Sequence, residues 1–237
     1  MDYKAKLLHD FFLKYKGQKI KILDIGSGKS ENFINILKEN PSFHYTGIEY
    51  RESSIEKARK NLNGLNFSIL KGFGENQSIQ QQNFDVVLSL SVLEHVKYLD
   101  EFLNETTSFL KKGGELLHRY DLGHAIYPST FRERIKVFLC NNFPFLISKK
   151  HFTCYPDLNN ICEILKQNNI INIEITQYQM PSLKKAMNIL GKNKSLDDLT
   201  TDLQKLEVKI YENLKLSLSQ KEIDILFPSI LIKGIKN

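Results

Sequence analysis

The stretch that decides the fold is KILDIGSGKSENF, residues 21–33. It starts as a short β-branched apolar run, reaches an acid at Asp24, turns through Gly26-Ser27-Gly28, and continues into residues that can form a helix. Glycines at these two positions allow a tight turn and a close approach of the backbone to a ligand. The pattern predicts the first strand–helix unit of an open parallel sheet, in which ligands bind at the carboxyl ends of the strands.

The chain around this turn alternates strand and helix patterns. Helices are expected at 30–39, 53–62 and 99–110, each followed by a stop signal such as Asn40-Pro41. This alternation predicts an α/β fold with a parallel, doubly wound sheet. Strands are expected at 20–25, 43–49, 65–71, 84–89, 115–120 and 170–176, and in the closing stretch FPSILIKGI.

Composition indicates an ordinary globular protein. The chain has 237 residues, 41% hydrophobic and 25% charged, which suits a single domain over 1–237. No apolar run approaches the roughly 20 residues of a membrane span, and the N-terminus reads as an amphipathic helix. Three cysteines without metal-ligand spacing predict reduced thiols in a cytoplasmic protein. The net charge of +6 favours an anionic substrate, while neither a membrane nor a nucleic acid is expected as a partner.

The second half of the chain is less regular. Residues 121–156 are rich in aromatics and are expected to pack as a cover over an acceptor pocket, where core packing is favoured over a substrate platform. Residues 156–167 read as a helix. Residues 181–224 form a helical addition between the last two strands, which serves either substrate binding or formation of a homodimer; the pattern does not separate these roles.

The acids near the glycine turn discriminate between cofactors. Glu49 ends the second expected strand, where a carboxylate can accept two hydrogen bonds from a ribose diol. A nicotinamide site would bring a pyrophosphate to the helix N-terminus, and Glu31 and Asp24 would face that dianion poorly. S-adenosylmethionine carries a sulfonium, an ammonium and a carboxylate but no phosphate, so these acids fit it better. The alternative is a glycine turn with an unrelated surface acid.

Four stretches in order, KILDIGSGKS, YTGIEY, FDVVLSLSVLEHV and LKKGGELL, resemble the class I S-adenosylmethionine-dependent methyltransferases that modify quinones and other small molecules. The resemblance covers about residues 19–120. It implies a Rossmann-like seven-stranded sheet whose last strand inserts antiparallel beside strand five, with helical and aromatic cap insertions. It also implies a cofactor site in which Asp24, Gly26, Ser27 and Gly28 hold the methionine end, Glu49 the ribose and Tyr50 the adenine, with Phe73, Gly74 and Leu90 beside them.

Two positions depart from that family pattern. A third glycine is replaced by Ser30, a tolerated change at a helix start. After strand three the family often has Gly-Asp-Ala-Glu, whereas this chain has Gly72-Phe73-Gly74-Glu75. Phe73 cannot accept a hydrogen bond from the adenine amino group. It either stacks on the base or leaves that bond to Glu75.

Three histidines are candidates for a general base in methyl transfer to a hydroxyl. His95 follows the fourth strand, His118 lies in the fifth, and His124 comes after it. Histidine side chains ordinarily titrate near neutrality, and all three are expected near the carboxyl ends of these strands. The alternative for each histidine is that it only packs or forms hydrogen bonds within the protein. No metal site is expected.

The fifth strand also supplies candidates for acceptor binding. Its alternation places His118 and Tyr120 on one face and Arg119 and Asp121 on the other. Arg119 either binds a phosphate or carboxylate on the acceptor or pairs with Asp121. Tyr120, Asp121 and the following Tyr127 complete the expected acceptor site.

These patterns predict S-adenosylmethionine-dependent methyl transfer to a small polar or anionic acceptor, at the oxygen of a sugar, nucleotide-sugar or related metabolite. The HRYDLGHAIYP stretch also resembles methyltransferases of surface-polysaccharide pathways. Methylation of a protein or RNA is the alternative within the class. The alternative outside it is a protein that binds the cofactor without turnover.

Overall fold

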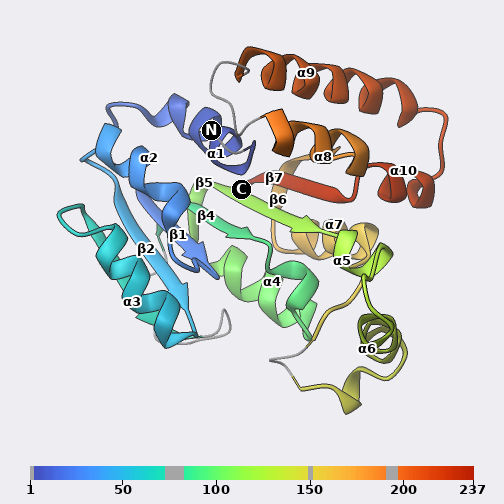
Figure 1. Cartoon of the computed structure of the whole chain (residues 1–237). Helices are drawn as coiled ribbons and strands as arrows, with labels where there is room; N and C mark the ends of the chain where they lie inside the picture. The colour runs from blue at the N-terminus through green and yellow to red at the C-terminus, as the bar shows by residue number, and fades with distance from the viewer. Residues whose placement is uncertain (1–2, 73–82, 149–151, 191–196) are drawn as a thin grey trace.

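The computed structural model describes residues 3–72, 83–148, 152–190 and 197–237. Its centre is a seven-stranded sheet with the order β3-β2-β1-β4-β5-β7-β6 (Figure 1). Strand β4, FDVVLSL, is buried over nearly its whole length, as its continuous apolar character predicts. The strands are β1 Lys21–Ile25, β2 His44–Glu49, β3 Phe67–Lys71, β4 Phe84–Leu90, β5 Leu110–Asp121, β6 Ile170–Tyr178 and β7 Ser229–Lys236.

Strand β7 confirms the expected antiparallel insertion. The neighbours β3, β2, β1, β4 and β5 pair in parallel. Strand β7 then enters between β5 and β6 and is antiparallel to both. The fold is therefore the Rossmann-like α/β sheet that the sequence predicts.

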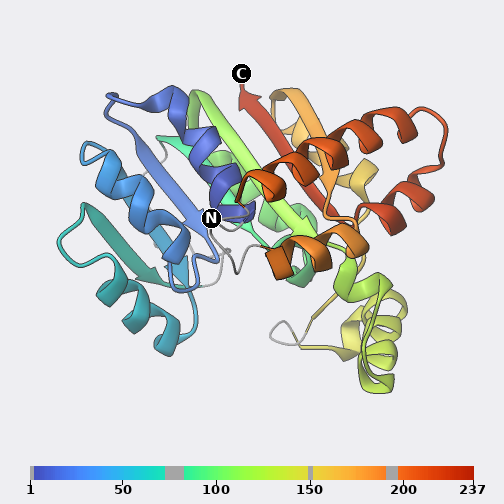
Figure 2. The same ribbon diagram turned by 45° about the horizontal axis from the view of Figure 1, so that its top comes forward.

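Helices cover both faces of the sheet (Figures 1 and 2). On one face α1, α2 and α3 bury apolar side chains against β1, β2 and β4. On the other face α4 and α7 pack over β4, β5 and β7. The helices are α1 Tyr3–Phe12, α2 Ile34–Glu39, α3 Glu52–Asn61, α4 Leu99–Ser108, α5 Gly123–Ile126, α6 Phe131–Asn142, α7 Leu158–Gln167, α8 Pro181–Leu190, α9 Asp197–Leu214 and α10 Gln220–Leu226.

Several element bounds differ from the sequence expectation. Strand β5 runs over twelve residues and continues to Asp121, beyond the expected 115–120. The helix expected at 30–39 is a 3₁₀ turn, Glu31–Phe33, followed by the short α2. The helical addition 181–224 divides into α8, α9 and the start of α10. Among the described residues, no helix is long and apolar enough to cross a membrane.

Residues 123–148 form a lobe at the edge of the molecule. It comprises α5, α6 and the 3₁₀ turn Pro144–Leu146. In both views α6 stands away from the sheet (Figures 1 and 2). The sequence favoured core packing for the aromatics of 121–156, but Phe131 is 76% exposed and Phe145 is 74% exposed, whereas Phe152 is buried.

Candidate active site

The glycine turn folds back over the end of β2. The amides of Gly26 and Ser27 both donate to the carbonyl of Ile48, each at 2.9 Å. Gly26 has φ +74°, and a Cβ there would lie 2.5 Å from Cγ2 of Val92. A Cβ at Gly47 of β2 would lie 2.7 Å from the Ser27 hydroxyl. Glycine is therefore required both in the turn, at Gly26, and in the strand beneath it, at Gly47.

Glu49 fixes the outer part of the same turn. Its Oε2 accepts a hydrogen bond from the amide of Gly28 at 3.0 Å, and its Oε1 accepts from the amides of Tyr50 and Arg51 at 2.9 and 2.8 Å. Gly28 has φ +55°, and no described atom lies within 4 Å of the position of a Cβ there. The turn thus has an open side next to a carboxylate that is only 6% exposed.

Asp24 lies beneath the turn in the sheet. It is 2% exposed, and its Oδ2 accepts a hydrogen bond from the Tyr45 hydroxyl at 2.8 Å. Burial and the charge of Asp24 raise the pKa of Tyr45 well above its ordinary value. Ser30, whose hydroxyl is 3.0 Å from that of Tyr45, has φ +54°. This left-handed backbone explains why glycine suits the position.

These residues fit S-adenosylmethionine. An open backbone turn, a buried acid below it and a carboxylate at the end of β2 match the cofactor's ammonium, carboxylate and ribose. Tyr50 lies beside this carboxylate, and its hydroxyl accepts a hydrogen bond from Nε of Arg51 at 2.6 Å. Leu90 is buried at the end of β4. Phe73 and Gly74, expected at the adenine, lie outside the described residues, as does Glu75.

His118 is placed in the core, which corrects its expected role as a base. The side chain is fully buried beside Phe102 of α4, and Nδ1 lies 2.7 Å from the Ser89 hydroxyl. Burial lowers its pKa to about 3. A ring that is enclosed and neutral at physiological pH cannot reach an acceptor in this structure.

Arg119 occupies a buried network, not an open anion site. Its guanidinium donates to the Tyr178 hydroxyl at 3.0 Å, to Ser91 Oγ at 2.7 Å, and to Gln179 Oε1 and Ser229 Oγ at 3.0 Å. It also lies 3.6 Å from the Asp121 carboxylate. Of the two roles that the sequence left open, the structure therefore favours the structural one.

The other expected acceptor residues are also engaged within the protein. Tyr120 is fully buried on the face of His118, as the alternation predicts. Asp121 accepts the Gly123 amide at 2.8 Å and lies 3.4 Å from Nζ of Lys184. Although burial opposes its ionisation, these contacts and Arg119 lower its pKa. The Tyr127 hydroxyl donates to the carbonyl of Ile225, so it joins α5 to α10.

Of the candidate bases whose side chains the structure describes, His95 stays accessible. It closes the 3₁₀ turn Leu93–His95 after β4, and its side chain is exposed. Its Nδ1 lies 3.1 Å from the carbonyl of Phe152 and 3.3 Å from the Thr153 hydroxyl. His124 belongs to α5, but its side chain lies outside what the structure describes.

Glu94 is a residue that sequence reasoning did not single out. It is 1% exposed, and Oε2 has no hydrogen-bond partner among the described residues. Burial raises its pKa to about 7, although Arg119 and the amide of Asp121 oppose the shift. The available signal was an acid flanked by apolar residues in VLEHV, directly after a buried strand.

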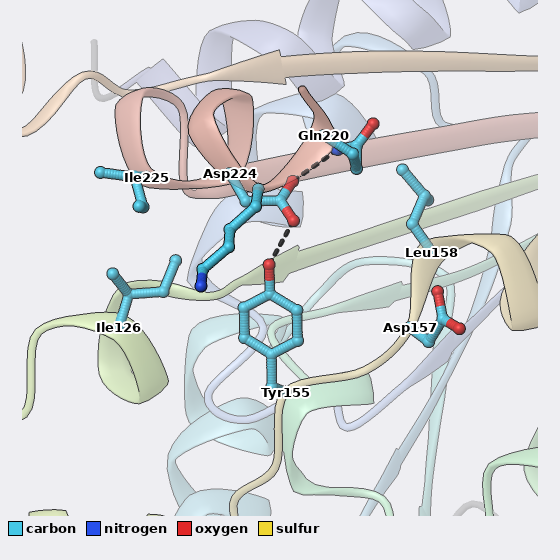
Figure 3. A pocket seen from close by; sticks show the side chains of 8 residues that line it. Ile126, Tyr155, Asp157, Leu158, Gln220, Asp224 and Ile225 are labelled. Atoms are coloured by element: carbon cyan, nitrogen blue, oxygen red, sulfur yellow. Dashed lines mark hydrogen bonds between the residues drawn. The ribbon is translucent and has the colours of Figure 1, made fainter. Parts of the chain in front are cut away.

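A pocket of about 420 Å³ lies between α5, the start of α7 and α10 (Figure 3). Ile126, Leu158 and Ile225 form apolar walls. Asp224, which is 4% exposed, accepts hydrogen bonds from Tyr155, Gln177 and Gln220. The polar groups at its centre thus satisfy one another. Among the described residues, no group of three or more His, Cys, Asp or Glu side chains could hold a metal.

This sheet, with its glycine turn and buried acids, defines an S-adenosylmethionine-dependent methyltransferase. The family model for the methyltransferase domain matches residues 16–136. The chain therefore belongs to the methyltransferase-domain family, and the cofactor is S-adenosylmethionine.

Curated relatives are similar over part of their length. A ubiquinone biosynthesis O-methyltransferase of Maricaulis maris is 33% identical over 102 residues, which cover 41% of this chain and 39% of that protein. A phthiotriol/phenolphthiotriol dimycocerosates methyltransferase of Mycobacterium ulcerans is 28% identical over 108 residues, which cover 45% and 38%. These alignments span less than half the length of the relatives.

Solved structures share the fold over nearly the whole chain. Phosphoethanolamine N-methyltransferase 2 of Haemonchus contortus, in complex with S-adenosylmethionine, matches with a TM-score of 0.63 and 20% identity over 99% of this chain and 52% of that one. A methyltransferase of Archaeoglobus fulgidus matches with a TM-score of 0.58 and 16% identity over 98% and 93%.

Proposed function

We propose that this chain transfers a methyl group from S-adenosylmethionine to a hydroxyl of a small polar molecule, such as a sugar or nucleotide-sugar. The observation that carries this proposal is the position of His95. It is an exposed base at the carboxyl end of β4, the strand next to β1 and its glycine turn. The net charge of +6 supports an acceptor that carries a phosphate or carboxylate.

The chain's own residues would position the reactants and accept a proton. The bound cofactor supplies an electrophilic methyl carbon on a positive sulfur. Glu49 would accept a ribose hydroxyl, and the turn 26–28 would hold the methionine end. For the Phe152 carbonyl to accept a hydrogen bond from His95, Nδ1 must carry the proton. The basic lone pair is then on Nε2, where it can take the proton of the attacking hydroxyl.

A variant of His95 tests the proposal. We expect His95→Gln to keep its affinity for S-adenosylmethionine in calorimetry and to lose about 10²–10⁴-fold in turnover. Turnover would be measured as transfer of a labelled methyl group to a panel of sugars and nucleotide-sugars. The matched control is His44→Gln, at the opposite end of the strands, which should behave as wild type.

Three results would contradict parts of this proposal. Normal turnover of His95→Gln would remove His95 as the base. Tight cofactor binding with no product from any acceptor would instead support a binding protein without turnover. Transfer to a protein or RNA, but not to the sugars, would move the acceptor to another class.

A further inference from the structure

Within the lobe 123–148, α6 and the 3₁₀ turn after it expose their apolar side. Phe131, Ile135 and Phe138 of α6 are 76%, 44% and 57% exposed. Their spacing of four and then three residues places them on one face of the helix. The opposite face bears Cys140, which is 2% exposed. The apolar face of this helix is therefore turned away from the protein.

The exposed face continues beyond the helix. The ring of Phe143 lies 6.3 Å from that of Phe138 and 6.3 Å from that of Phe145. Phe145 and Leu146, in the 3₁₀ turn, are 74% and 63% exposed. We call these residues the apolar ridge: Phe131, Ile135, Phe138, Phe143, Phe145 and Leu146. Exposed apolar patches of this kind mark interaction sites with proteins or membranes.

Positive charge lies on both sides of the apolar ridge. At 100° per residue, Arg132 and Arg134 project to opposite sides of the line through Phe131 and Phe138, and both are exposed. The acid Glu133 is directed to the helix start, where its Oε2 accepts hydrogen bonds from the Ser129 hydroxyl and from the amides of Ser129 and Thr130. The ridge thus combines aromatic side chains with flanking arginines.

The lobe is fixed to the protein beside the candidate active site. Lys136 donates to the Thr153 hydroxyl at 2.9 Å, and Lys97 donates to the carbonyl of Ile147 at 2.9 Å. The Thr153 amide donates to Sγ of Cys140 at 3.4 Å. Thr153 is also a neighbour of His95. These contacts hold the helix with its apolar side outward, so the exposure is built into the fold.

We propose that the apolar ridge binds an anionic membrane surface. A convex row of phenylalanines on a projecting helix can enter the boundary between headgroups and acyl chains, while arginines on either side attract anionic lipids. A deformable surface suits a ridge better than a rigid protein groove does. The sequence analysis expected no membrane partner because it looked for an apolar run long enough to span. A surface helix needs no such run. This inference does not depend on the methyl acceptor.

Sedimentation with vesicles tests the proposal on the full chain. Wild type should bind vesicles of 70% phosphatidylcholine and 30% phosphatidylglycerol at least about 10-fold more tightly than pure phosphatidylcholine, and 0.5 M salt should weaken that binding. Phe131→Ser/Phe138→Ser should lose at least about 10-fold in affinity, and Arg132→Gln/Arg134→Gln should lose most of the preference for anionic vesicles. The matched control is Leu216→Ser, which removes an apolar side chain that is 86% exposed outside the lobe.

Three other results would overturn the proposal that the apolar ridge binds a membrane. Equal sedimentation of wild type and Phe131→Ser/Phe138→Ser would show that the ridge does not contact lipid. If wild type did not bind either vesicle, the proposal would fail outright. Light scattering that showed a wild-type dimer, converted to a monomer by the same double substitution, would assign the ridge to a second copy of the chain. Circular dichroism of each variant excludes loss of folding.

Discussion

A single carboxylate, that of Glu49, joins the two loops of the candidate cofactor site. It accepts hydrogen bonds from Gly28 after β1 and from Tyr50 and Arg51 after β2. A carboxylate has about four acceptor positions, so three amides leave capacity for a ribose hydroxyl. The same side chain therefore shapes the glycine turn and, as we propose, binds the ribose.

Replacing Glu49 should weaken cofactor binding, both through the lost ribose contact and through the glycine turn that the same carboxylate holds. We expect Glu49→Ala to reduce S-adenosylmethionine affinity by about 1.5–3 kcal/mol, because hydrogen bonds to a charged group are lost. Isothermal titration calorimetry measures this change. Glu52→Ala removes an exposed acid that pairs with Lys71 and should have wild-type affinity. Equal affinity of both variants would disprove the ribose assignment.

Glu94 makes stability depend on pH. Because its pKa is raised to about 7 from 4.5, the folded protein keeps a proton that the unfolded chain releases. Its stabilising contribution is complete below about pH 4.5 and is lost as the pH rises through about 7. Buried His118, with its pKa lowered to about 3, acts in the opposite sense: its contribution is lost as the pH falls below about 6.5.

The variant Glu94→Gln isolates the first of these effects. We compare the free energy of unfolding of this variant with that of wild type at pH 5 and at pH 8. The difference, variant minus wild type, should be about 2–3 kcal/mol larger at pH 8, at about 1.4 kcal/mol per pKa unit. Urea unfolding at the two pH values measures the change. Glu101→Gln, an exposed acid of α4, should show none. A constant difference between Glu94→Gln and wild type would argue against a raised pKa.

The sequence predicted on which face of β5 each of these residues lies, but it did not predict how deeply each is buried. Alternation placed His118 with Tyr120 and Arg119 with Asp121, as observed. It could not reveal that β5 continues to Asp121 or that α4 covers His118. The glycine turn and the places of Asp24 and Glu49 near the ends of their strands were predictable because they follow from local backbone geometry. Burial depends on packing between distant elements, and a single sequence does not record it.

At the scale of elements, Ser30 determines how the helical segment after β1 begins. Its left-handed backbone, with φ +54°, separates the glycine turn from the 3₁₀ turn and α2. The helical pattern at 30–39 was visible in the sequence, but this break was not. A serine, unlike a glycine, gives no indication in the sequence that its backbone has a positive φ. The division of 181–224 into separate helices was missed in the same way. Strands β1, β2 and β4 were predictable because their apolar runs end at clear stops.

Two substitutions at Ser30 should separate backbone strain from hydrogen bonding. Both Ser30→Gly and Ser30→Ala remove the hydroxyl near Tyr45. Only glycine adopts a positive φ without strain. We expect the glycine variant to exceed the alanine variant in free energy of unfolding by about 1 kcal/mol, measured by urea denaturation. Equal stability of the two variants would mean that the turn relaxes at no cost.

At the scale of the whole molecule, Arg119 of β5 connects the central strand β4 with β7 and the edge strand β6. Its partners Ser91, Tyr178, Gln179 and Ser229 lie at the ends of β4, β6 and β7. These strands are distant in the sequence, and the guanidinium joins them where the sheet changes from parallel to antiparallel pairing. Its planar fork of donors suits this task better than a lysine would.

Removing this side chain should destabilise the protein more than it affects acceptor binding. We expect Arg119→Met to lower the free energy of unfolding by about 3–5 kcal/mol, because it leaves buried polar partners without their donor. Chemical denaturation measures the loss. Arg59→Met, at an exposed position of α3, should stay within about 0.5 kcal/mol of wild type. A normal stability with a raised KM for the acceptor would restore the anion-binding role.

The insertion of β7 also sets the order in which the sheet can be completed during synthesis. The ribosome makes β6 before α8, α9 and α10, but β6 joins the sheet through β7, which follows them. At 5–20 residues per second, β6, which ends at Tyr178, waits about 3–10 s for β7, which begins at Ser229, and the edge of β5 stays unpaired for longer. Such edges are templates for intermolecular pairing. The yield of folded protein in a cell should thus depend on translation speed and chaperone supply in that interval, even where the finished sheet is stable.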